Sequence, residues 1–181
     1  MLKAIHLLLL FSCYSAVCYA STYEEKVALS KALVGQPVQT PTFLTSSGNE
    51  VSFPSLAGKP TVAYFFASWC APCYSSLKSL QAVQSAHPQS VNVIAISLDD
   101  GWDELNTMLE KTGYTGTVWK SEADSDVLIK KMFGNYAGSI PYTIKISADG
   151  VLTESSYSIK TEPQWKATLS NEVSLKDAEL K

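Results

Sequence analysis

The sequence predicts an α/β domain in which helices cover both faces of a central sheet. Runs rich in β-branched and aromatic residues, which are typical of strands, alternate with segments whose apolar residues recur at helical spacing. A β-hairpin and a final helix follow this alternation, and such a mixture is typical of layered α/β folds. No repeat, low-complexity tract or internal linker interrupts the pattern. We therefore expect one domain built around one sheet.

The domain is expected to begin with a short helix and a hairpin. Residues 21–33 are polar with loosely spaced apolar positions, which predicts a short helix. Residues 38–43 and 50–53 flank the turn-forming sequence Ser46-Ser-Gly48-Asn49, which predicts a β-hairpin. A turn at Gly58-Lys59-Pro60 then leads into a buried strand.

The remaining elements are expected to alternate between strand and helix. Continuous apolar runs predict buried strands, and apolar residues at every third or fourth position predict helices. Pro88, Gly113 and Gly134 are expected to end the three internal helices. In order, we expect strand 61–67, helix 71–86, strand 91–98, helix 100–112, strand 117–119, helix 125–133, a hairpin of strands 142–147 and 151–159, and a last helix that starts at Glu162-Pro163.

The first 20 residues have the character of a secretory signal. Lys3 supplies a short positive region, residues 5–17 are apolar, and a small residue precedes the expected cleavage point. An uncleaved membrane anchor is the alternative, although about 16 apolar residues are few for a membrane span. We therefore divide the chain into signal peptide 1–20, N-terminal extension 21–34 and α/β domain 35–181. The protein is expected to be periplasmic or secreted, where disulfides form and persist.

The charged residues argue against nucleic acid as a partner. The chain has 14 Lys+Arg against 17 Asp+Glu, and all of the basic residues are lysines. Arginine is the residue that recognises phosphates and base edges through paired hydrogen bonds. We therefore expect no nucleic-acid partner.

The sequence Trp69-Cys70-Ala71-Pro72-Cys73 contains the candidate catalytic residues. It lies at the junction between an expected buried strand and an expected helix. Cysteines three apart on a helix share one face, with Cα atoms roughly 5–5.5 Å apart, which is within disulfide reach. The first cysteine lies near the helix N-terminus, where the helix dipole favours a thiolate, and the second can resolve a mixed disulfide. The motif predicts a dithiol–disulfide redox pair formed by Cys70 and Cys73.

Half of a zinc site and a structural disulfide are the alternatives for this motif. Cys13 and Cys18 lie in the signal segment, so the exported chain would keep Cys70 and Cys73, with His87 as its one histidine. These ligands do not make a four-coordinate zinc site within one chain. We expect His87 to be an ordinary surface residue near a helix end, and we expect no metal and no cofactor.

Several stretches in the right order resemble exported thiol-disulfide oxidoreductases of the TlpA/ResA/DsbE type, which have the thioredoxin fold. The resemblance implies a thioredoxin-like three-layer sandwich over residues 35–181, with a mixed central sheet and an N-terminal β-hairpin extension. It extends over roughly residues 34–155 and rests on Val34-Gly-Gln-Pro37, Leu56-Ala-Gly-Lys-Pro60, Phe66-Ala-Ser-Trp-Cys-Ala-Pro-Cys73, Ser97-Leu-Asp99, Gly138-Ser-Ile-Pro141 and Asp149-Gly150.

The resemblance also implies roles for individual residues. Cys70 would be the nucleophile, Cys73 the resolving thiol, and Pro141 a cis-proline that faces the pair. Trp69, Ile140 and Pro141 would form the substrate-binding surface, where Ile140 offers backbone groups to a client peptide. The implied function is reduction of client protein disulfides, for example in cytochrome c maturation. A membrane electron-donor reductase of the DsbD type is the implied partner.

Three positions differ from the resembled proteins. Tyr64 stands where thioredoxins have a buried aspartate, Ser76 where ResA-like proteins have a glutamate, and Ala95 where a buried lysine is expected. Neither tyrosine nor serine is a competent base near neutral pH. We therefore expect water or groups of the client to accept the proton of Cys73.

Three other functions are compatible with a thioredoxin-like fold. A disulfide oxidase or isomerase of the DsbA type usually has a histidine between its cysteines, whereas Ala71-Pro72 carries no charge. A copper-binding assembly factor would add a third cysteine and a histidine ligand. A peroxiredoxin would need a threonine in place of Ala67 and an arginine elsewhere. We therefore favour the reductase and keep the DsbA-type enzyme as the first alternative.

Overall fold

The computed structural model describes residues 21–39, 41–56, 58–86, 89–121 and 132–170. The strands in this part of the chain are β1 (Phe43–Leu44), β2 (Glu50–Val51), β3 (Thr61–Phe66), β4 (Asn92–Ser97), β5 (Thr117–Ser121), β6 (Tyr142–Ile146) and β7 (Leu152–Ser156). The helices are α1 (Tyr23–Ala32), the short 3₁₀ helix η1 (Phe53–Leu56), α2 (Ala71–Ala86), α3 (Trp102–Thr112) and α5 (Glu162–Leu169). Among these residues, no helix is both long enough and apolar enough to cross a membrane.

The seven described strands form one mixed sheet with the order β2-β1-β5-β4-β3-β6-β7. Strands β3, β4 and β5 are parallel, and β6, β7, β1 and β2 join them in antiparallel pairs. The parallel strands are connected through α2 and α3. Because right-handed crossovers that step in one direction along a sheet lie on one face, both helices cover the same side. This mixed sheet is the one that the sequence predicts.

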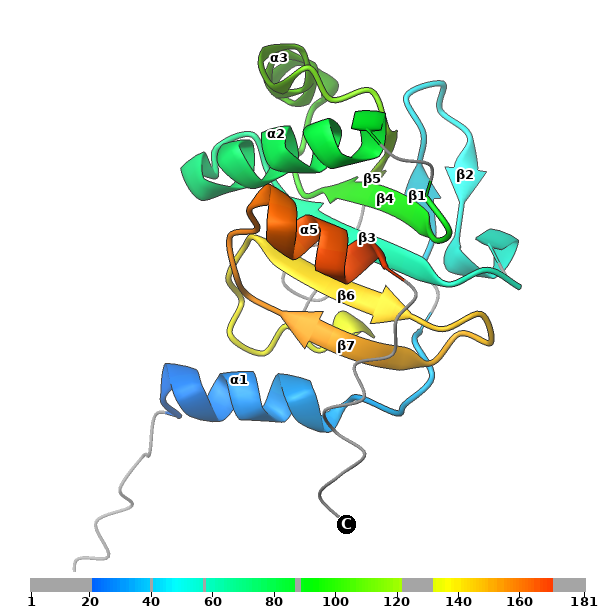
Figure 1. The fold of residues 1–181 in the computed structure, drawn as a ribbon, viewed down its shortest axis with the longest axis vertical. Coiled ribbons are helices and arrows are strands. Elements are labelled where there is room, and N and C mark those ends of the chain that lie inside the picture. The colour runs from blue at the N-terminus through cyan, green and yellow to red at the C-terminus, as the bar shows by residue number, and fades with distance from the viewer. Residues whose placement is uncertain (1–20, 40, 57, 87–88, 122–131, 171–181) are drawn as a thin grey trace, which may run out of the picture.

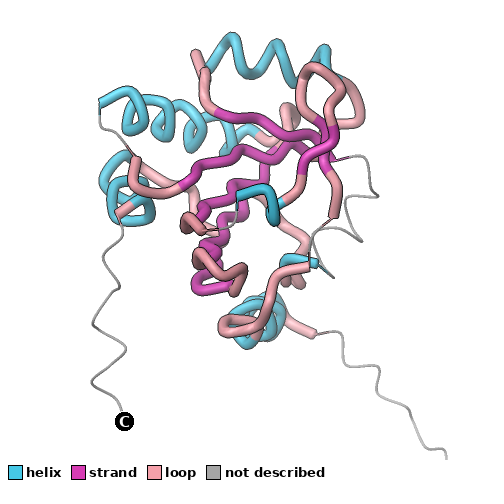
Figure 2. The backbone as a smooth tube through the Cα atoms, turned by 90° about the vertical axis from the view of Figure 1, so that its right-hand side faces the viewer, coloured by secondary structure: helices cyan, strands magenta, loops and turns pink. Residues whose placement is uncertain are grey.

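Helices lie on both faces of the sheet, which makes the three layers of the thioredoxin-like fold. Helix α2 contacts both α3 and α5 on the first face, and α1 contacts β7 at the opposite side of the molecule (Figure 1). Leu33, directly after α1, packs against the cluster of buried residues on the second face. Figure 2 shows the twisted strands in the middle with helices around them.

Strand β3 is the centre of the core, because each of its residues is buried. Its side chains alternate between the two faces. Val62, Tyr64 and Phe66 belong to the cluster that packs against α2, α3 and α5, and Ala63 and Phe65 belong to the cluster on the other face. The uninterrupted apolar run therefore reflects a strand that is covered on both sides.

Most of the expected elements are confirmed, and α2 has the bounds that the sequence predicts. The expected hairpin is present, but each of its strands has two residues. The chain turns into η1 soon after β2, where Pro54 lacks an N–H group for a longer ladder. Conversely, β5 extends to Ser121 because its last residues pair with β1.

Two other expectations lie outside the described residues. They concern the expected helix at 125–133, which is described only from residue 132 on, and the position of His87. The expected last helix is confirmed as α5, with Trp165 and Leu169 buried. This helix ends at Leu169, because the backbone of Ser170, its C-cap, is extended.

Candidate active site

The two cysteines lie where β3 leads into α2, and they form a disulfide. Cys70 directly precedes the helix, and its backbone N–H donates to the Ala67 carbonyl at 3.1 Å. Cys73 lies within the first helical turn, with its backbone N–H donating to the Cys70 carbonyl at 3.0 Å. The two Cα atoms are 5.2 Å apart, within the range that the helical spacing predicts.

Solvent reaches the two cysteines unequally. Cys73 has no exposed surface, whereas Cys70 is 6% exposed. The neighbouring Trp69 is 72% exposed, which is unusual for a large aromatic residue. The motif therefore exposes an indole and a small part of Cys70 at the surface, while Cys73 lies in the core.

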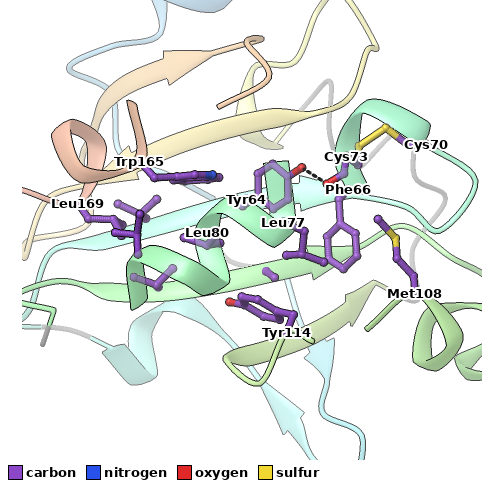
Figure 3. Packing of buried hydrophobic residues seen from close by; sticks show 14 of the residues in the cluster. Tyr64, Phe66, Cys70, Cys73, Leu77, Leu80, Met108, Tyr114, Trp165 and Leu169 are labelled. Carbon is purple, nitrogen blue, oxygen red and sulfur yellow. Dashed lines mark hydrogen bonds between the residues drawn. A yellow bond between two sulfur atoms is a disulfide. The ribbon is translucent and has the colours of Figure 1, made fainter. Parts of the chain in front are cut away.

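A tyrosine lies beneath Cys73, in the position where thioredoxins have a carboxylate. The Tyr64 hydroxyl donates to the Cys73 carbonyl at 3.1 Å (Figure 3). Its ring stacks on Phe66 and meets Trp165 edge-on, with centroids 5.8 and 5.3 Å away. Burial raises the pKa of Tyr64 well above its ordinary value, and a hydrogen bond with Ser76 offsets this only partly. Tyr64 is therefore a neutral donor at physiological pH.

Ser76 lies near Tyr64 and contacts the segment that precedes α5. The buried Ser76 hydroxyl accepts from the Lys160 backbone N–H at 3.1 Å. The Tyr64 hydroxyl donates to the Cys73 carbonyl. Neither side-chain group is a carboxylate.

Lys160 is buried on the same face of the sheet, next to α5. Its ammonium Nζ is 3.4 Å from the Ser156 hydroxyl and 5.8 Å from the centre of the Trp165 ring. Burial lowers the pKa of Lys160, and the charge of Glu154 offsets part of this effect. The fold thus contains a buried lysine, but it follows β7 instead of occupying the position of Ala95.

A carboxylate supports the other side of the dithiol motif. Asp99 is 5% exposed, and both of its carboxylate oxygens lie 3.0 Å from the backbone N–H of Ser68. The hydroxyls of Ser68 and Ser97 also donate to this carboxylate, at 2.6 and 2.7 Å. Residues 67–70, which we call the dithiol loop, are therefore attached to the end of the neighbouring parallel strand β4.

The Ile140–Pro141 peptide bond is cis, as the resemblance predicts. Pro141 precedes β6, whose first residue Tyr142 is paired with Phe65 near the end of β3. This register brings the proline to the edge of the sheet where the dithiol loop begins. Ile140 packs against the same apolar cluster as Cys70 and Cys73. We call residues 134–141 the cis-proline loop.

Within the cis-proline loop, an asparagine side chain supports the residue before Ile140. Asn135 has no exposed surface. Its Nδ2 donates to the Ser139 carbonyl at 2.8 Å, and its Oδ1 accepts from the Ser139 N–H at 3.3 Å. The Tyr142 hydroxyl donates to the Phe133 carbonyl at 2.8 Å and so connects the two ends of the loop.

A groove of about 520 Å³ lies beside the dithiol loop, between the first turns of α2 and the exposed side of α3. It is lined by Ser68, Ala71, Tyr74, Glu104, Thr107, Met108 and Lys111. Another cavity, of about 320 Å³, includes Thr61 at the opposite end of β3. The groove adjoins the disulfide, whereas the cavity is remote from it.

The structure brings the residues expected at the site to one edge of the sheet: Trp69, Cys70 and Cys73 after β3, and Ile140 and Pro141 before β6. Their individual roles stay predictions. Sequence reasoning gave no role to Asp99, although it lies in a stretch that carries the resemblance. It missed Asn135 and Lys160, for which the sequence offers no local signal.

Comparison with known proteins identifies the family. Residues 34–155 match the model of the AhpC/TSA family. Tryparedoxin of Trypanosoma brucei brucei is 34% identical over 110 residues, which cover 60% of this chain and 74% of tryparedoxin. The sporulation thiol-disulfide oxidoreductase A of Bacillus subtilis is 36% identical over 66 residues, which cover 35% of this chain and 39% of that protein.

Solved structures support the fold. The crystal structure of StoA from Bacillus subtilis has a TM-score of 0.59 at 23% identity, covering 74% of this chain and 97% of StoA. A secreted disulfide oxidoreductase of Mycobacterium tuberculosis, homologous to DsbE of E. coli, has a TM-score of 0.54 at 24% identity, covering 70% and 95% of the two chains. The family match, these similar proteins and the disulfide together show that the chain belongs to the AhpC/TSA family, as a thioredoxin-fold thiol-disulfide oxidoreductase of the TlpA/ResA/DsbE-like type.

Proposed function

We propose that this protein reduces disulfides of exported client proteins, with Cys70 as the nucleophile and Cys73 as the resolving thiol. The observation that carries the proposal is the difference in exposure, because Cys70 is 6% exposed and Cys73 is fully buried. A client disulfide can therefore approach Cys70 first. The helix dipole at the start of α2 also favours the thiolate form of Cys70.

The reaction would proceed in two exchange steps. The Cys70 thiolate attacks one sulfur of the client disulfide, which forms a mixed disulfide and releases the other client sulfur as a thiolate. The Cys73 thiolate then attacks the Cys70 sulfur, which closes the Cys70–Cys73 disulfide and releases the second client thiolate. Two electrons pass to the client, and the two thiol protons of the protein balance the two new client thiols.

The proton of Cys73 would leave to water or to groups of the client. Tyr64 retains its own proton because burial raises its pKa. The hydroxyl of Ser76, the other neighbour of this turn, accepts the backbone N–H of Lys160. Both groups can stabilise the position of Cys73, but neither can act as a base near neutral pH.

The substrate-binding surface would consist of Trp69, Ile140 and Pro141. An extended client segment would pair with the backbone of Ile140, as peptides do when they add to an exposed strand edge. The exposed indole of Trp69 would cover the client on the other side of the disulfide. This surface lies at the sheet edge where the cysteines are, so a bound disulfide would meet Cys70.

The residues between the cysteines favour reduction over oxidation. Strong oxidants have a highly stabilised thiolate in their reduced form, whereas Ala71 and Pro72 bring no charge next to Cys70. We expect a reduction potential near the value of about −270 mV of thioredoxin, and a value near about −120 mV would indicate the DsbA-type oxidase. Each catalytic cycle leaves the protein oxidised, so a membrane electron-donor reductase of the DsbD type would return two electrons and two protons.

The proposed location is the periplasm or the extracellular space. Support comes from the apolar segment 1–20 of the sequence, which lies outside the described residues. The similar Mycobacterium tuberculosis protein is itself described as secreted. Cytochrome c maturation, which needs thiols kept reduced in an oxidising space, is one pathway in which such a reductase would act.

Trapping of mixed disulfides tests the assignment of the two cysteines. A Cys73→Ser variant should accumulate covalent complexes with disulfide-bonded clients, because the second exchange step is blocked. A Cys70→Ser variant should form none, because its remaining thiol is buried. The complexes are counted on non-reducing gels, with the wild type as control. The opposite pattern would show that the roles are reversed.

A further inference from the structure

Helix α1 contacts the cis-proline loop, although the two are more than 100 residues apart in the sequence. The hydroxyl of Ser30, near the end of α1, accepts the backbone N–H of Tyr136 at 3.2 Å, across a separation of 106 residues. Ser30 has no exposed surface. The helix itself lies before residues 34–155, which match the family model.

A tyrosine hydroxyl extends this contact to the next residue of the loop. The Tyr157 hydroxyl lies 2.6 Å from the Ser30 hydroxyl and accepts the backbone N–H of Ala137 at 3.4 Å. Ser30 donates its proton to the Lys26 carbonyl at 3.0 Å. Because Ser30 has one proton, Tyr157 must donate to Ser30. The Ala137 N–H is thus bonded to a directed chain that ends inside α1, and the Tyr136 N–H is shared between Ser30 and the Gly134 carbonyl, which is 2.9 Å away.

Packing adds two further contacts, one between Leu33, directly after α1, and Gly134 of the loop, and one between α1 and Tyr157. Gly134 has a φ of +70°, and a Cβ atom there would lie 2.6 Å from a methyl group of Leu33. Only a glycine permits this conformation together with such a close approach. The centre of the Tyr157 ring lies 4.7 Å from that of Tyr142, the first residue of β6, and 6.1 Å from that of Tyr23 of α1. The segment made of α1 and Leu33 therefore touches the start of the loop and also packs against Tyr157.

Hydrogen bonds within the loop connect these contacts to Ser139, the residue before Ile140. Tyr136 and Ala137, whose N–H groups are bonded to Ser30 and Tyr157, lie between Asn135 and Ser139. The Asn135 side chain bonds both backbone groups of Ser139, which precedes Ile140. Fixing one side of this small ring of contacts restricts the other, because the buried Asn135 side chain bonds both backbone groups of Ser139 and so couples the two sides.

We propose that α1 supports the substrate-binding surface, with Ser30 and Tyr157 as positioning residues for the backbone of Ile140. This inference rests on the proposed function, since it assumes that a client strand pairs with Ile140. Neither Ser30 nor Tyr157 touches the reacting sulfurs. Their effect is to hold the cis-proline loop in the conformation that accepts a client, so their loss reduces client affinity more than turnover.

Steady-state kinetics with a protein client tests the proposal. Insulin is the disulfide client, and dithiothreitol supplies the electrons. We expect Ser30→Ala and Tyr157→Phe each to raise KM for insulin about threefold to tenfold, because each variant removes one side-chain acceptor of a loop N–H, with a smaller change in kcat. Leu29→Ala, at an exposed position on the same helix, should leave both constants unchanged. A purely structural role would lower kcat through a smaller folded fraction and leave KM unchanged.

Two further measurements make the test decisive. Amide hydrogen exchange in Ser30→Ala should accelerate at Tyr136 and Ala137 but not in α2. The double variant should raise KM by less than the product of the single effects, because both residues act on the same loop. Unchanged exchange at Tyr136 and Ala137, or an unchanged KM in both single variants, would overturn the proposal. Failure of the wild type to reduce insulin would instead overturn the proposed function, and this is measured before the variants are compared.

Discussion

The dithiol loop and the cis-proline loop meet at the same edge of the sheet, but they are supported by different chemistry. The dithiol loop is attached through a buried carboxylate, that of Asp99, which accepts hydrogen bonds from Ser68 and Ser97. The cis-proline loop is attached through neutral groups, the amide of Asn135 and the hydroxyls of Ser30 and Tyr157. Hydrogen bonds to a charged group are roughly twice as strong as neutral ones.

This difference suggests that the dithiol loop is held rigidly and that the cis-proline loop can adjust to its client. Strong, charged support keeps the backbone before Cys70 in one position, which suits a group that undergoes covalent exchange in every cycle. Several weaker, neutral contacts leave the cis-proline loop able to adjust by small amounts, which suits a surface that accepts different clients. Variants on the two sides should therefore change different steps of the reaction.

The largest effect is expected at Asp99. Asp99→Asn replaces one acceptor oxygen by an amino group that faces the donors of Ser68 and Ser97, so it should lower the free energy of unfolding by about 2–3 kcal/mol. It should also change the rate at which dithiothreitol reduces the Cys70–Cys73 disulfide, because the dithiol loop becomes mobile. Denaturant unfolding and the dithiothreitol rate measure the two effects.

The adjacent Asp100 offers a matched control, because it carries the same charge at an exposed position. Asp100→Asn should change neither quantity appreciably. If Asp99→Asn behaved like this control, charged support would not distinguish the dithiol loop from its neighbour.

A smaller effect is expected at Asn135. Asn135→Ala removes two neutral hydrogen bonds to Ser139, which should cost about 1–2 kcal/mol of unfolding free energy. The kinetic change should appear in KM for insulin, with little change in the dithiothreitol rate of the disulfide. Asn106→Ala, at an exposed position on α3, is the control. An altered dithiothreitol rate together with an unaltered KM would contradict the division between the loops.

The smallest effect concerns the buried charge of Lys160. Burial lowers the pKa of Lys160 below its ordinary value of 10.5, so the folded protein releases this proton at a lower pH than the unfolded chain. Between the lowered pKa and 10.5, the unfolded chain binds more protons, and stability rises with pH. Lys160→Met should remove this rise, and unfolding free energies from about pH 7 to about pH 10 measure it.

Two comparisons separate the contribution of Lys160 to the pH dependence of stability from that of other groups. Lys166→Met changes the same residue type at an exposed position of α5 and should keep the wild-type pH profile. The tyrosines with a raised pKa, which lower stability as pH approaches and passes 10.0, are present in both proteins, so the difference between wild type and Lys160→Met isolates the lysine. A wild-type stability that does not rise more than that of Lys160→Met would show that the ammonium is well solvated.

The sequence by itself determined the features that depend on neighbouring residues. The three-residue spacing of Cys70 and Cys73 at a strand-to-helix junction specified the disulfide, because helical geometry fixes that distance. The apolar run at 61–66 specified the central strand, and the bounds of α2 followed from the motif before it and Pro88 after it. The cis-proline followed from the resemblance and not from a local pattern.

Only the tertiary structure decided which polar side chains support the site. Ser30 bonds a residue 106 positions away, Ser76 one 84 positions away, and Asp99 one 31 positions away. Serines, asparagines and lysines are usually exposed, so nothing in a single sequence marks the few that are buried. Their partners are backbone groups, which every residue carries and which leave no signature in the sequence. The packing of α1 against the cis-proline loop, of β4 against the dithiol loop and of α5 against α2 selects them, because each buried N–H at these contacts must find an acceptor there.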